Sequence, residues 1–465
     1  MGGKKRGNTL KWRPFFQSAK NKRFLFLIFL QMLIFHQLKQ ELTKSYSKVG
    51  REQGLVAIQA SMPLLEANIP LLGWLKTQKT SYPHFFLQYR DTDQTIATIG
   101  TLRQFYTLEA AQSFIQQHHF PLIGGLQFEG NTQFILPQFS LVKNQQNLTA
   151  CFYFDSDNFE QQAVIFEQFL ANFSQITELG LTDNPLVSMS ATSHFEQWKA
   201  NIEKAIVSIE QGDFQKVVLA NAMRLHFEQP ICAYSLLAQS QKTNLGCYHF
   251  LWAESADVAF LGSTPERLYQ RQGLHFSTEA LAGTAAVTTS EVQTELNAQW
   301  LLSDPKNIYE NQLVVDDIEN QLKDCVTEFA VSEAKIKRLH NVQHLRRQIQ
   351  ATLKPDTSDS DCLSKIHPTA AVAGLPRQKA KGFITENEPF TRHWYAGTLG
   401  VMGNEEAEFC VTLRSALISQ NSITLYAGAG IVSGSDPQSE WQEIKRKAQG
   451  MAKLLDVDLV TKGEL

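Results

Sequence analysis

The chain has 465 residues, a length that permits one large domain or several ordinary ones. Hydrophobic residues make up 43% of it and charged residues 19%, a globular composition that excludes extensive disorder. The formal net charge of -3 provides no positive field to attract a nucleic acid, so a small-molecule ligand is favoured. The six cysteines form no C-x-x-C pair, which argues against a zinc ribbon or a dithiol redox site and indicates a reducing, cytoplasmic compartment.

The N-terminus combines a basic segment with the apolar run FLFLIFLQMLIF at residues 24–35. This order is similar to a secretory signal peptide, but no small-residue cleavage site follows, and the run is short for a membrane span. The favoured interpretation is an amphipathic or disordered extension, or a start site placed too far upstream; an uncleaved anchor and a cleaved signal are the alternatives. We therefore expect residues 1–37 to be an extension without stable membrane insertion.

Residues 38–190 are expected to form the N-terminal part of the domain. From about residue 55 onward, short apolar or aromatic runs such as HFFLQYRD and PLIGGLQF are broken by Gly, Pro, Asn and Asp, which indicates strands and turns. Residues 107–119 are predicted to form a helix between them. No linker is long or polar enough to separate independent domains, so one mixed domain is preferred.

Residues 191–465 are expected to form the catalytic region. Apolar residues recur at three- and four-residue steps from 195 to 209, which predicts an amphipathic helix that ends at Gly212. Strands are predicted at residues 215–225, 258–264, 273–283, 393–402, 407–418 and 422–430, and helices at residues 295–323, 341–353 and 437–455. Because strands occur in blocks without strict βαβ alternation, the pattern favours an α+β fold with antiparallel sheets.

Two side chains are candidates for proton transfer. Lys216 begins an apolar strand; it is either a surface lysine at the sheet edge or, if it points into a closed cleft, a general base whose pKa is lowered by desolvation. Glu266 follows the buried run FLGSTP and is either solvated and paired with Arg267 or a loop carboxylate fixed by a rigid strand, as catalytic acids often are. Taken singly, each residue favours the surface interpretation.

Carboxylates on two predicted helices are candidates for a metal site. Glu310 lies on the first helix, and Glu440, Glu443 and Lys447 share one face of the second. Mg²⁺ prefers few protein oxygens and keeps waters, so two carboxylates and a ligand's own carboxylate would suit it. The alternative is that Glu443 only pairs with Lys447 along the helix surface.

The segment from Tyr426 to Gly434 is predicted to be a glycine loop that follows a strand and precedes a helix capped by Asp436, where bare N–H groups could approach an anion. Its G-x-G-x-x-x-G spacing makes a dinucleotide site improbable. Arg392, Tyr395 and Arg414 lie on predicted strands. An arginine within an apolar strand needs an anion, so Arg414 is either a buried ion-pair partner or a clamp for a ligand carboxylate.

The order and wording of these segments resemble the chorismate-utilising family, which comprises anthranilate synthase large subunits, aminodeoxychorismate synthases, isochorismate synthases and salicylate synthases. The resemblance covers essentially residues 195–455. It implies one large α+β domain in which two packed, largely antiparallel sheets have helices outside and an active site between them, as in anthranilate synthase component I. The phrases that carry the resemblance are FQKVVLA, FLGSTPERL, ALAGT, ENQLVVDDI, NVQHL, HPTAAVAGLP, RHWYAGTLG, AEFCVTLRSA, YAGAGIVSGSDP and EWQEIKRKA.

The resemblance also implies residue roles. Lys216 would activate water for attack at ring carbon 2 of chorismate, and Glu266 would protonate the hydroxyl that leaves carbon 4. Glu310 and Glu443 would hold Mg²⁺, with Glu440 nearby through water. The remaining implied substrate-binding residues are Tyr395 and Arg414 on the enolpyruvyl carboxylate, Gly428 and Lys447 near the metal, and Ala282, Gly283 and Thr284 of the ALAGT phrase.

Three positions indicate the subfamily. Water-using members resemble this chain in having Lys216, where aminating members have Gln, so no glutamine amidotransferase subunit is expected. Aminodeoxychorismate synthases have Lys at the position of Ala282, and anthranilate and salicylate synthases tend to have Thr at or near Ala371. The expected activity is therefore that of an isochorismate synthase, with a salicylate synthase and a non-catalytic, membrane-tethered relative as alternatives.

The phrase PLLGWLKTQKTSYPHFFLQYRD also resembles members of the menaquinone pathway rather than the siderophore type. Two residues depart from the family pattern: Asn311 replaces the usual His after the metal-binding glutamate, and Asn221 replaces a frequent Arg. The first departure could alter contacts to the substrate near the metal. A monomer or a homodimer is expected.

Overall fold

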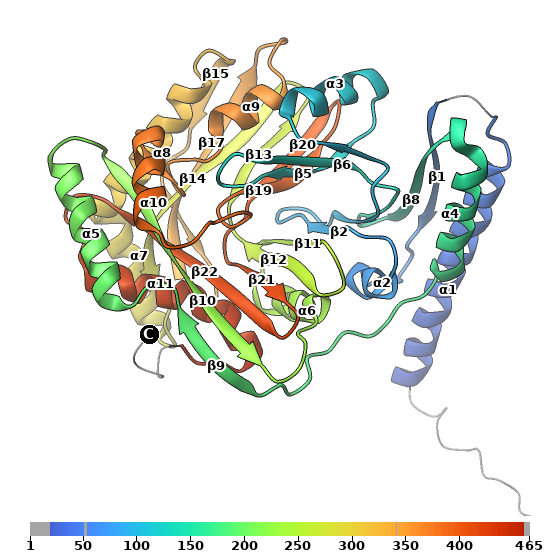
Figure 1. The fold of residues 1–465 in the computed structure, drawn as a ribbon, viewed down its shortest axis with the longest axis horizontal. Coiled ribbons are helices and arrows are strands. Elements are labelled where there is room, and N and C mark those ends of the chain that lie inside the picture. The colour runs from blue at the N-terminus through green and yellow to red at the C-terminus, as the bar shows by residue number, and fades with distance from the viewer. Residues whose placement is uncertain (1–18, 51–53, 341, 460–465) are drawn as a thin grey trace, which may run out of the picture.

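The computed structural model describes residues 19–50, 54–340 and 342–459, which form two large antiparallel sheets with helices around them (Figure 1). The first sheet contains, in spatial order, β1 (Leu55–Pro63), β8 (Asn147–Asp155), β7 (Phe139–Lys143), β3 (Thr95–Ile99), β2 (His84–Gln88), β11 (Tyr248–Ala253), β12 (Val258–Thr264), β21 (Ser415–Ser419), β22 (Ser422–Ile431), β10 (Lys216–Phe227) and β18 (Gly374–Leu375), with β9 (Leu186–Ala191) beside β10. The second contains β15 (Val326–Val331), β17 (Val342–Leu353), β14 (His275–Ala286), β13 (Arg267–Gln272), β20 (Glu406–Val411), β19 (Thr398–Met402), β5 (Leu122–Leu126), β6 (Thr132–Leu136) and β4 (Arg103–Phe105), with β16 (Lys335–Arg338) beside β17.

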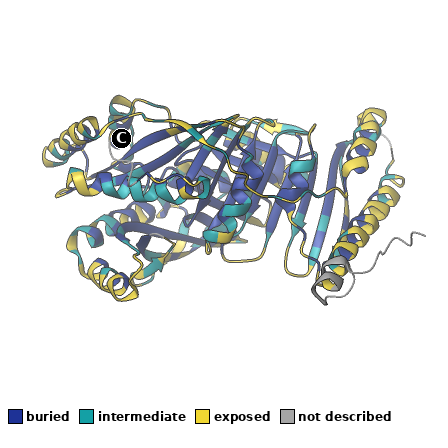
Figure 2. Cartoon of the chain, turned by 90° about the horizontal axis from the view of Figure 1, so that it is seen from below, coloured by how far each residue is buried: buried dark blue, intermediate teal, exposed yellow. Residues whose placement is uncertain are grey.

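The helices cover the outer faces of these sheets (Figure 1). They are α1 (Ala19–Tyr46), α2 (Leu71–Thr77), α3 (Leu108–His118), α4 (Phe159–Asn172), α5 (Phe195–Glu210), α6 (Ala233–Thr243), α7 (Glu291–Ser303), α8 (Pro305–Leu322), α9 (Asp359–Ile366), α10 (Arg377–Asn387) and α11 (Pro437–Ala452), with 3₁₀ turns at Ser156–Asn158 and Lys453–Leu455. Their inner faces are buried and their outer faces exposed (Figure 2). This is the expected α+β architecture.

Both parts of the chain contribute strands to both sheets. In the first sheet β2 pairs with β11, and in the second β5 pairs with β19. A continuous ladder of hydrogen bonds across residues 38–190 and 191–465 makes them one domain, because neither part can complete a sheet alone.

The extension expected at residues 1–37 is not separate from the domain. Its residues 1–18 lie outside the described part, but α1 begins at Ala19 and runs past the expected boundary at residue 38. The boundary was wrong because the buried side chains of α1, among them Leu30, Ile34 and Leu38, recur at helical spacing across it and pack against β1 and β8. No helix among the described residues is long and apolar enough to cross a membrane.

Two predicted helices were wrong. Residues 341–353 were predicted to be helical, but the segment is strand β17, paired with β14 and with β15 and β16; Asn341 lies outside the described residues. Val342, Leu345 and Ile349 recur at three- and four-residue steps, a pattern that a strand can also contain. Pairing on both sides outweighs so weak a periodicity. The helix predicted at 295–323 is broken into α7 and α8 because Pro305 disfavours helical backbone at Asp304, whose side chain then caps α8.

Candidate functional site

A cavity opens between the two sheets. Its wall is formed by strands β10, β14, β17 and β22, helices α8 and α11, and the turns that precede β13, β19 and β21. The lining includes ten of the eleven predicted site residues: Glu266, Ala282, Gly283, Thr284, Glu310, Tyr395, Arg414, Gly428, Glu443 and Lys447. The eleventh, Lys216, lies directly behind this wall, against Glu310.

Lys216 is the first residue of β10, and its side chain is fully buried. Its Nζ lies 3.0 Å from Oε1 of Glu310 on α8, an ion pair without hydrogen-bond geometry, and the amine has no other hydrogen-bond partner in the described chain. Burial contradicts the surface interpretation that the sequence favoured. A buried amine with unused donors, beside one carboxylate at the wall of a cavity, is suited to exchange a proton with a ligand.

The ion pair occupies space that is free only because residue 430 is a glycine. Gly430 lies on β22, which pairs with β10, and a Cβ at this position would lie 2.2 Å from Oε1 of Glu310 and 3.0 Å from Cε of Lys216. Gly428 has a similar role, because a Cβ there would lie 2.9 Å from the hydroxyl of Tyr395. Both glycines are part of strand β22 rather than of the predicted anion-binding loop, since the strand runs to Ile431.

Glu266 lies in the turn between β12 and β13, as predicted, and is 4% exposed. Burial, and after it the charge of Glu279, raise the pKa of Glu266 to about 8, although Lys216, Lys447 and Arg90 lower it. The expected pair with Arg267 does not form, because that guanidinium binds Glu408 and Asp91 instead. Glu266 is therefore mostly protonated at neutral pH and can act as an acid.

A buried charge cluster behind Glu266 was missed in the sequence. Glu279 on β14 accepts hydrogen bonds from Arg90, at 2.5 Å, and from Arg346, at 2.6 Å. Arg90 also donates to the backbone oxygen of Pro265, next to the acid. Arg90 therefore fixes the turn that carries Glu266. The negative charge of Glu279 raises the pKa of Glu266 and so favours its protonated form. The only available signal was the RD pair at the end of the phrase HFFLQYRD.

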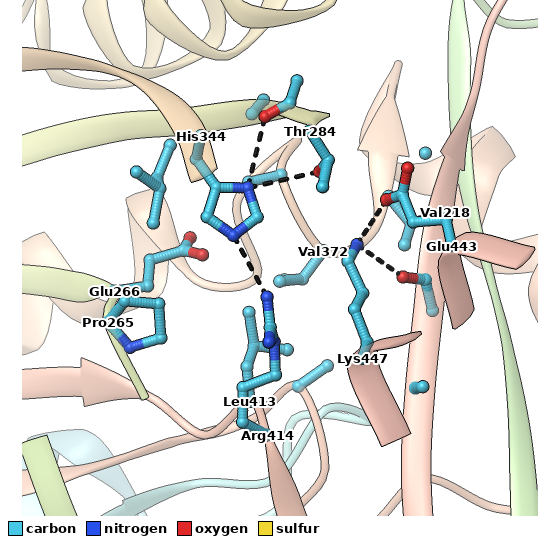
Figure 3. A pocket seen from close by; sticks show the side chains of 18 of the residues that line it. Val218, Pro265, Glu266, Thr284, His344, Val372, Leu413, Arg414, Glu443 and Lys447 are labelled. Atoms are coloured by element: carbon cyan, nitrogen blue, oxygen red, sulfur yellow. Dashed lines mark hydrogen bonds and ion pairs between the residues drawn. The ribbon is translucent and has the colours of Figure 1, made fainter. Parts of the chain in front are cut away.

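Each candidate metal-binding carboxylate pairs with a lysine. Besides Glu310 with Lys216, Glu443 lies 2.6 Å from Lys447 and Glu440 lies 2.7 Å from Lys306. The sequence left open whether Glu443 pairs along the helix or faces a site; it does both, since it and Lys447 line the cavity (Figure 3). Burial and the charge of Glu443, one turn further along α11, raise the pKa of Glu440.

The guanidinium of Arg414 is oriented by His344, which the sequence did not single out (Figure 3). Nη2 of Arg414 lies 3.0 Å from Nε2 of His344, and Nδ1 of His344 lies 3.2 Å from the oxygen of Gly283 and from Oγ1 of Thr284. Since arginine only donates, Nε2 accepts and Nδ1 carries the proton. Burial and the charge of Arg414 lower the pKa of His344 to about 3, so the ring is neutral.

Arg414 contacts no carboxylate at ion-pair distance within the described residues, although it is enclosed in the cavity wall. Of the two roles that the sequence left open, this favours a clamp for a ligand anion. Arg392, Tyr395 and Arg414 were predicted on strands, but all three lie outside strands. Arg414 has a φ of 49° between β20 and β21, and Tyr395 lies in the turn before β19, stacked on Tyr426.

Three other residues singled out in the sequence have structural contacts. Arg392 is buried against Glu388 and donates to the backbone oxygens of Val218 and Val372. The side-chain amide of Asn311 donates to backbone oxygens of β14 and β17, so it ties α8 to the sheet and does not line the cavity. Asn221 joins β10 to Ser193. Neither Asn221 nor Asn311 lines the cavity.

The raised pKa of Glu266 predicts a stability effect. Between pH 4.5, the ordinary value, and about pH 8, the folded protein holds a proton that the unfolded chain releases, so this residue destabilises the fold increasingly as pH rises. Glu266→Gln should therefore raise the free energy of unfolding at pH 8 by about 2 kcal/mol or more, and by much less at pH 5. Urea denaturation without ligand at both pH values measures this; an equal difference at both would contradict the assigned protonation.

Comparison with known proteins identifies the family. The family described as chorismate binding enzymes matches residues 127–456. The isochorismate synthase MenF of Haemophilus influenzae is 45% identical over 83% of this chain and 89% of its own length. The structure of the menaquinone-specific isochorismate synthase MenF from Escherichia coli covers 90% of this chain and 99% of its own with a TM-score of 0.85 and 38% identity. Anthranilate synthase component I from Streptococcus pneumoniae shares the fold, with a TM-score of 0.62 and 18% identity over 88% of this chain and 96% of its own. The two-sheet fold, the cavity between the sheets and these matches show that the chain belongs to the chorismate binding enzyme family.

Proposed function

We propose that this protein is a magnesium-dependent isochorismate synthase that interconverts chorismate and isochorismate, as part of menaquinone biosynthesis. The observation that carries the proposal is that the buried carboxyl of Glu266 lines the same cavity as Glu310, behind which the buried amine of Lys216 lies at 3.0 Å. The similarity to isochorismate synthases over most of the chain supports the same activity.

The reaction requires one proton to be removed and one to be supplied. Lys216 accepts a proton from the water that adds to ring carbon 2. Glu266 gives its proton to the hydroxyl that leaves carbon 4 as water, and the ring double bonds shift between the two positions. One proton is accepted and one is given, so no net proton is consumed. The reverse reaction exchanges the roles of the two residues.

The cavity also supplies the groups that hold the substrate. Arg414, fixed by the neutral ring of His344, and Tyr395 bind the enolpyruvyl carboxylate. Ala282, Gly283 and Thr284 form the wall beside them, and His344 joins Gly283 and Thr284 to the arginine. Lys447 donates to the backbone oxygen of Gly428 at 2.8 Å, so its charge faces the region where the ring carboxylate would bind.

The metal would be held by Glu310 and Glu443, with Glu440 near it through water. No group of three or more His, Cys, Asp or Glu in the described residues is arranged to hold a metal ion by itself. Two carboxylates nevertheless fit Mg²⁺, which takes oxygen ligands and completes its shell with waters and substrate oxygens. When bound, the metal would neutralise the ring carboxylate of chorismate. The lysines at 2.6–3.0 Å balance these carboxylates without it.

Two positions favour a synthase over the alternatives. Ala282 and Ala371 both line the cavity, and neither offers a polar group there. A salicylate synthase, which would eliminate pyruvate from isochorismate, tends to have a hydroxyl near Ala371, and the aminating relatives have other residues at these positions. Lys216, Glu266, Glu310 and Glu443 argue against a non-catalytic relative. The proposal includes a cytoplasmic location, which the six unpaired cysteines support. It also includes a monomer or homodimer without an amidotransferase subunit.

Incubation of the purified protein with chorismate and Mg²⁺ should yield isochorismate, and incubation with isochorismate should yield chorismate. Lys216→Ala and Glu266→Gln should each lower kcat by about 100-fold or more, because each removes one proton-transfer group. Chromatography of the products measures both effects, and Lys199→Ala, at an exposed position of α5, is the control variant. Salicylate and pyruvate as main products would contradict the synthase assignment.

Removal of either metal-binding carboxylate should change the response to Mg²⁺. Glu310→Gln and Glu443→Gln each remove one charged oxygen ligand, so the Mg²⁺ concentration for half-maximal rate should rise about tenfold or more, or turnover should cease. A titration of the rate with Mg²⁺ measures this, with chelator-treated enzyme as the starting point. The same half-maximal concentration in both variants as in the native protein would exclude these residues as ligands.

Gly430→Ala should abolish most turnover while the protein stays folded. The added Cβ would displace Glu310 and Lys216, on which both the metal and the base depend. Gly382→Ala is the matched control, since a Cβ at this position in α10 has no atom within 4 Å and should leave the rate unchanged. Circular dichroism and initial rates distinguish the outcomes; native activity in Gly430→Ala would show that the Lys216–Glu310 geometry is dispensable.

A further inference from the structure

Helix α1 presents an apolar face that nothing in the described structure covers. Its inner face, with Leu30, Ile34 and Leu38, is buried against the first sheet. On the opposite face Phe29 is 62% exposed and Met32 65%, and Ile28 and Leu33, also exposed, lie on this same face. Phe26 is 53% exposed but lies one turn before Leu30, on the inner side of the helix. We call Ile28, Phe29, Met32 and Leu33 the outer face of α1.

Such a surface requires an occupant. A helix segment that is apolar on all sides is normally buried, and an exposed patch of contiguous large apolar side chains marks an interaction site in a soluble protein. Figure 1 shows α1 at one margin of the molecule, beside α4, while α11, which lines the cavity, lies toward the other. An occupant on the outer face of α1 would leave the cavity accessible.

The charge of the sequence that leads into and through this helix identifies the occupant. Residues 1–40 contain nine Lys or Arg and no Asp or Glu, whereas residues 41–465 contain 34 and 46, a net charge of -12. The basic residues are Lys4, Lys5, Arg6, Lys11, Arg13, Lys20, Lys22, Arg23 and Lys39. A basic segment joined to an apolar helix face is the combination that binds anionic membrane surfaces, with the apolar face at the acyl boundary and the charges among the headgroups.

We propose that α1 binds the protein peripherally to an anionic lipid surface, with the outer face of α1 toward the bilayer. In this arrangement α1 lies parallel to the plane of the membrane. It does not require a spanning helix, which the described residues do not contain. The inner face of α1 stays packed on β1 and β8, so binding needs no unfolding.

Co-sedimentation of the full chain with vesicles tests this proposal. Vesicles of mixed phosphatidylglycerol and phosphatidylcholine should bind the protein about tenfold more tightly than vesicles of phosphatidylcholine alone, and high salt should weaken the binding. The double variant Phe29→Ser, Met32→Ser should lose most binding through the lost apolar contacts. The triple variant Lys20→Glu, Lys22→Glu, Arg23→Glu should lose the preference for anionic vesicles.

The matched control is Val187→Ser, Val207→Ser, which replaces two exposed apolar residues, 58% and 48% exposed, on β9 and α5. It should bind anionic vesicles as the native protein does, and all variants should convert chorismate at the native rate in solution, which shows that they are folded. Equal binding to both kinds of vesicle, or full binding by Phe29→Ser, Met32→Ser, would overturn the proposal. The proposal would also be overturned if light scattering showed that the native protein is a dimer that binds no vesicles and that Phe29→Ser, Met32→Ser makes it a monomer. A second copy of the chain would then cover the outer face of α1.

Discussion

The buried ion pair between Lys216 and Glu310 is the constraint on which the site depends. Lys216 belongs to the first sheet, and Glu310 to α8, which packs on the second, so the pair joins the two layers. Burying an isolated amine or carboxylate is costly, and the cost is offset only if the partner is held close. The layers must therefore be positioned so that the charges meet. Gly430 is required between them because any side chain there would occupy the space of the carboxylate.

The other charged groups around the cavity are also paired or oriented by specific partners. Glu443 and Glu440 have lysine partners, Glu279 has two arginines, and Arg414 has only a neutral histidine. Acidic groups next to lysines can exchange their partner for a metal, while the arginine without a carboxylate can take that of a ligand. Glu266 is the exception. Its carboxyl is buried near Glu279, and both burial and that charge raise its pKa. This arrangement lowers the stability of the fold, so a structural role would not explain it.

Helix α1 shows how one segment can belong to the core and to a surface at once. Its inner side chains complete the packing of β1 and β8, and its outer side chains are as apolar as the inner ones. The run FLFLIFLQMLIF looked like a targeting segment because hydropathy in a sequence does not record on which side each residue lies. The three-dimensional packing divides that run into a buried half and an exposed half.

The sequence by itself determined the family and the two-sheet α+β class, because the phrases that carry the resemblance follow one another in the family's order. It also predicted eleven site residues, of which ten line one cavity. Taken singly, however, most of these residues favoured surface or structural roles, because charge pairing and burial depend on contacts between distant segments. The tertiary structure alone decided that Lys216 is buried, that β17 is a strand carrying His344, and that Arg90 reaches Pro265 across 175 positions of sequence. Local spacing cannot encode these features, because each arises from sheet pairing and packing between segments far apart in the chain.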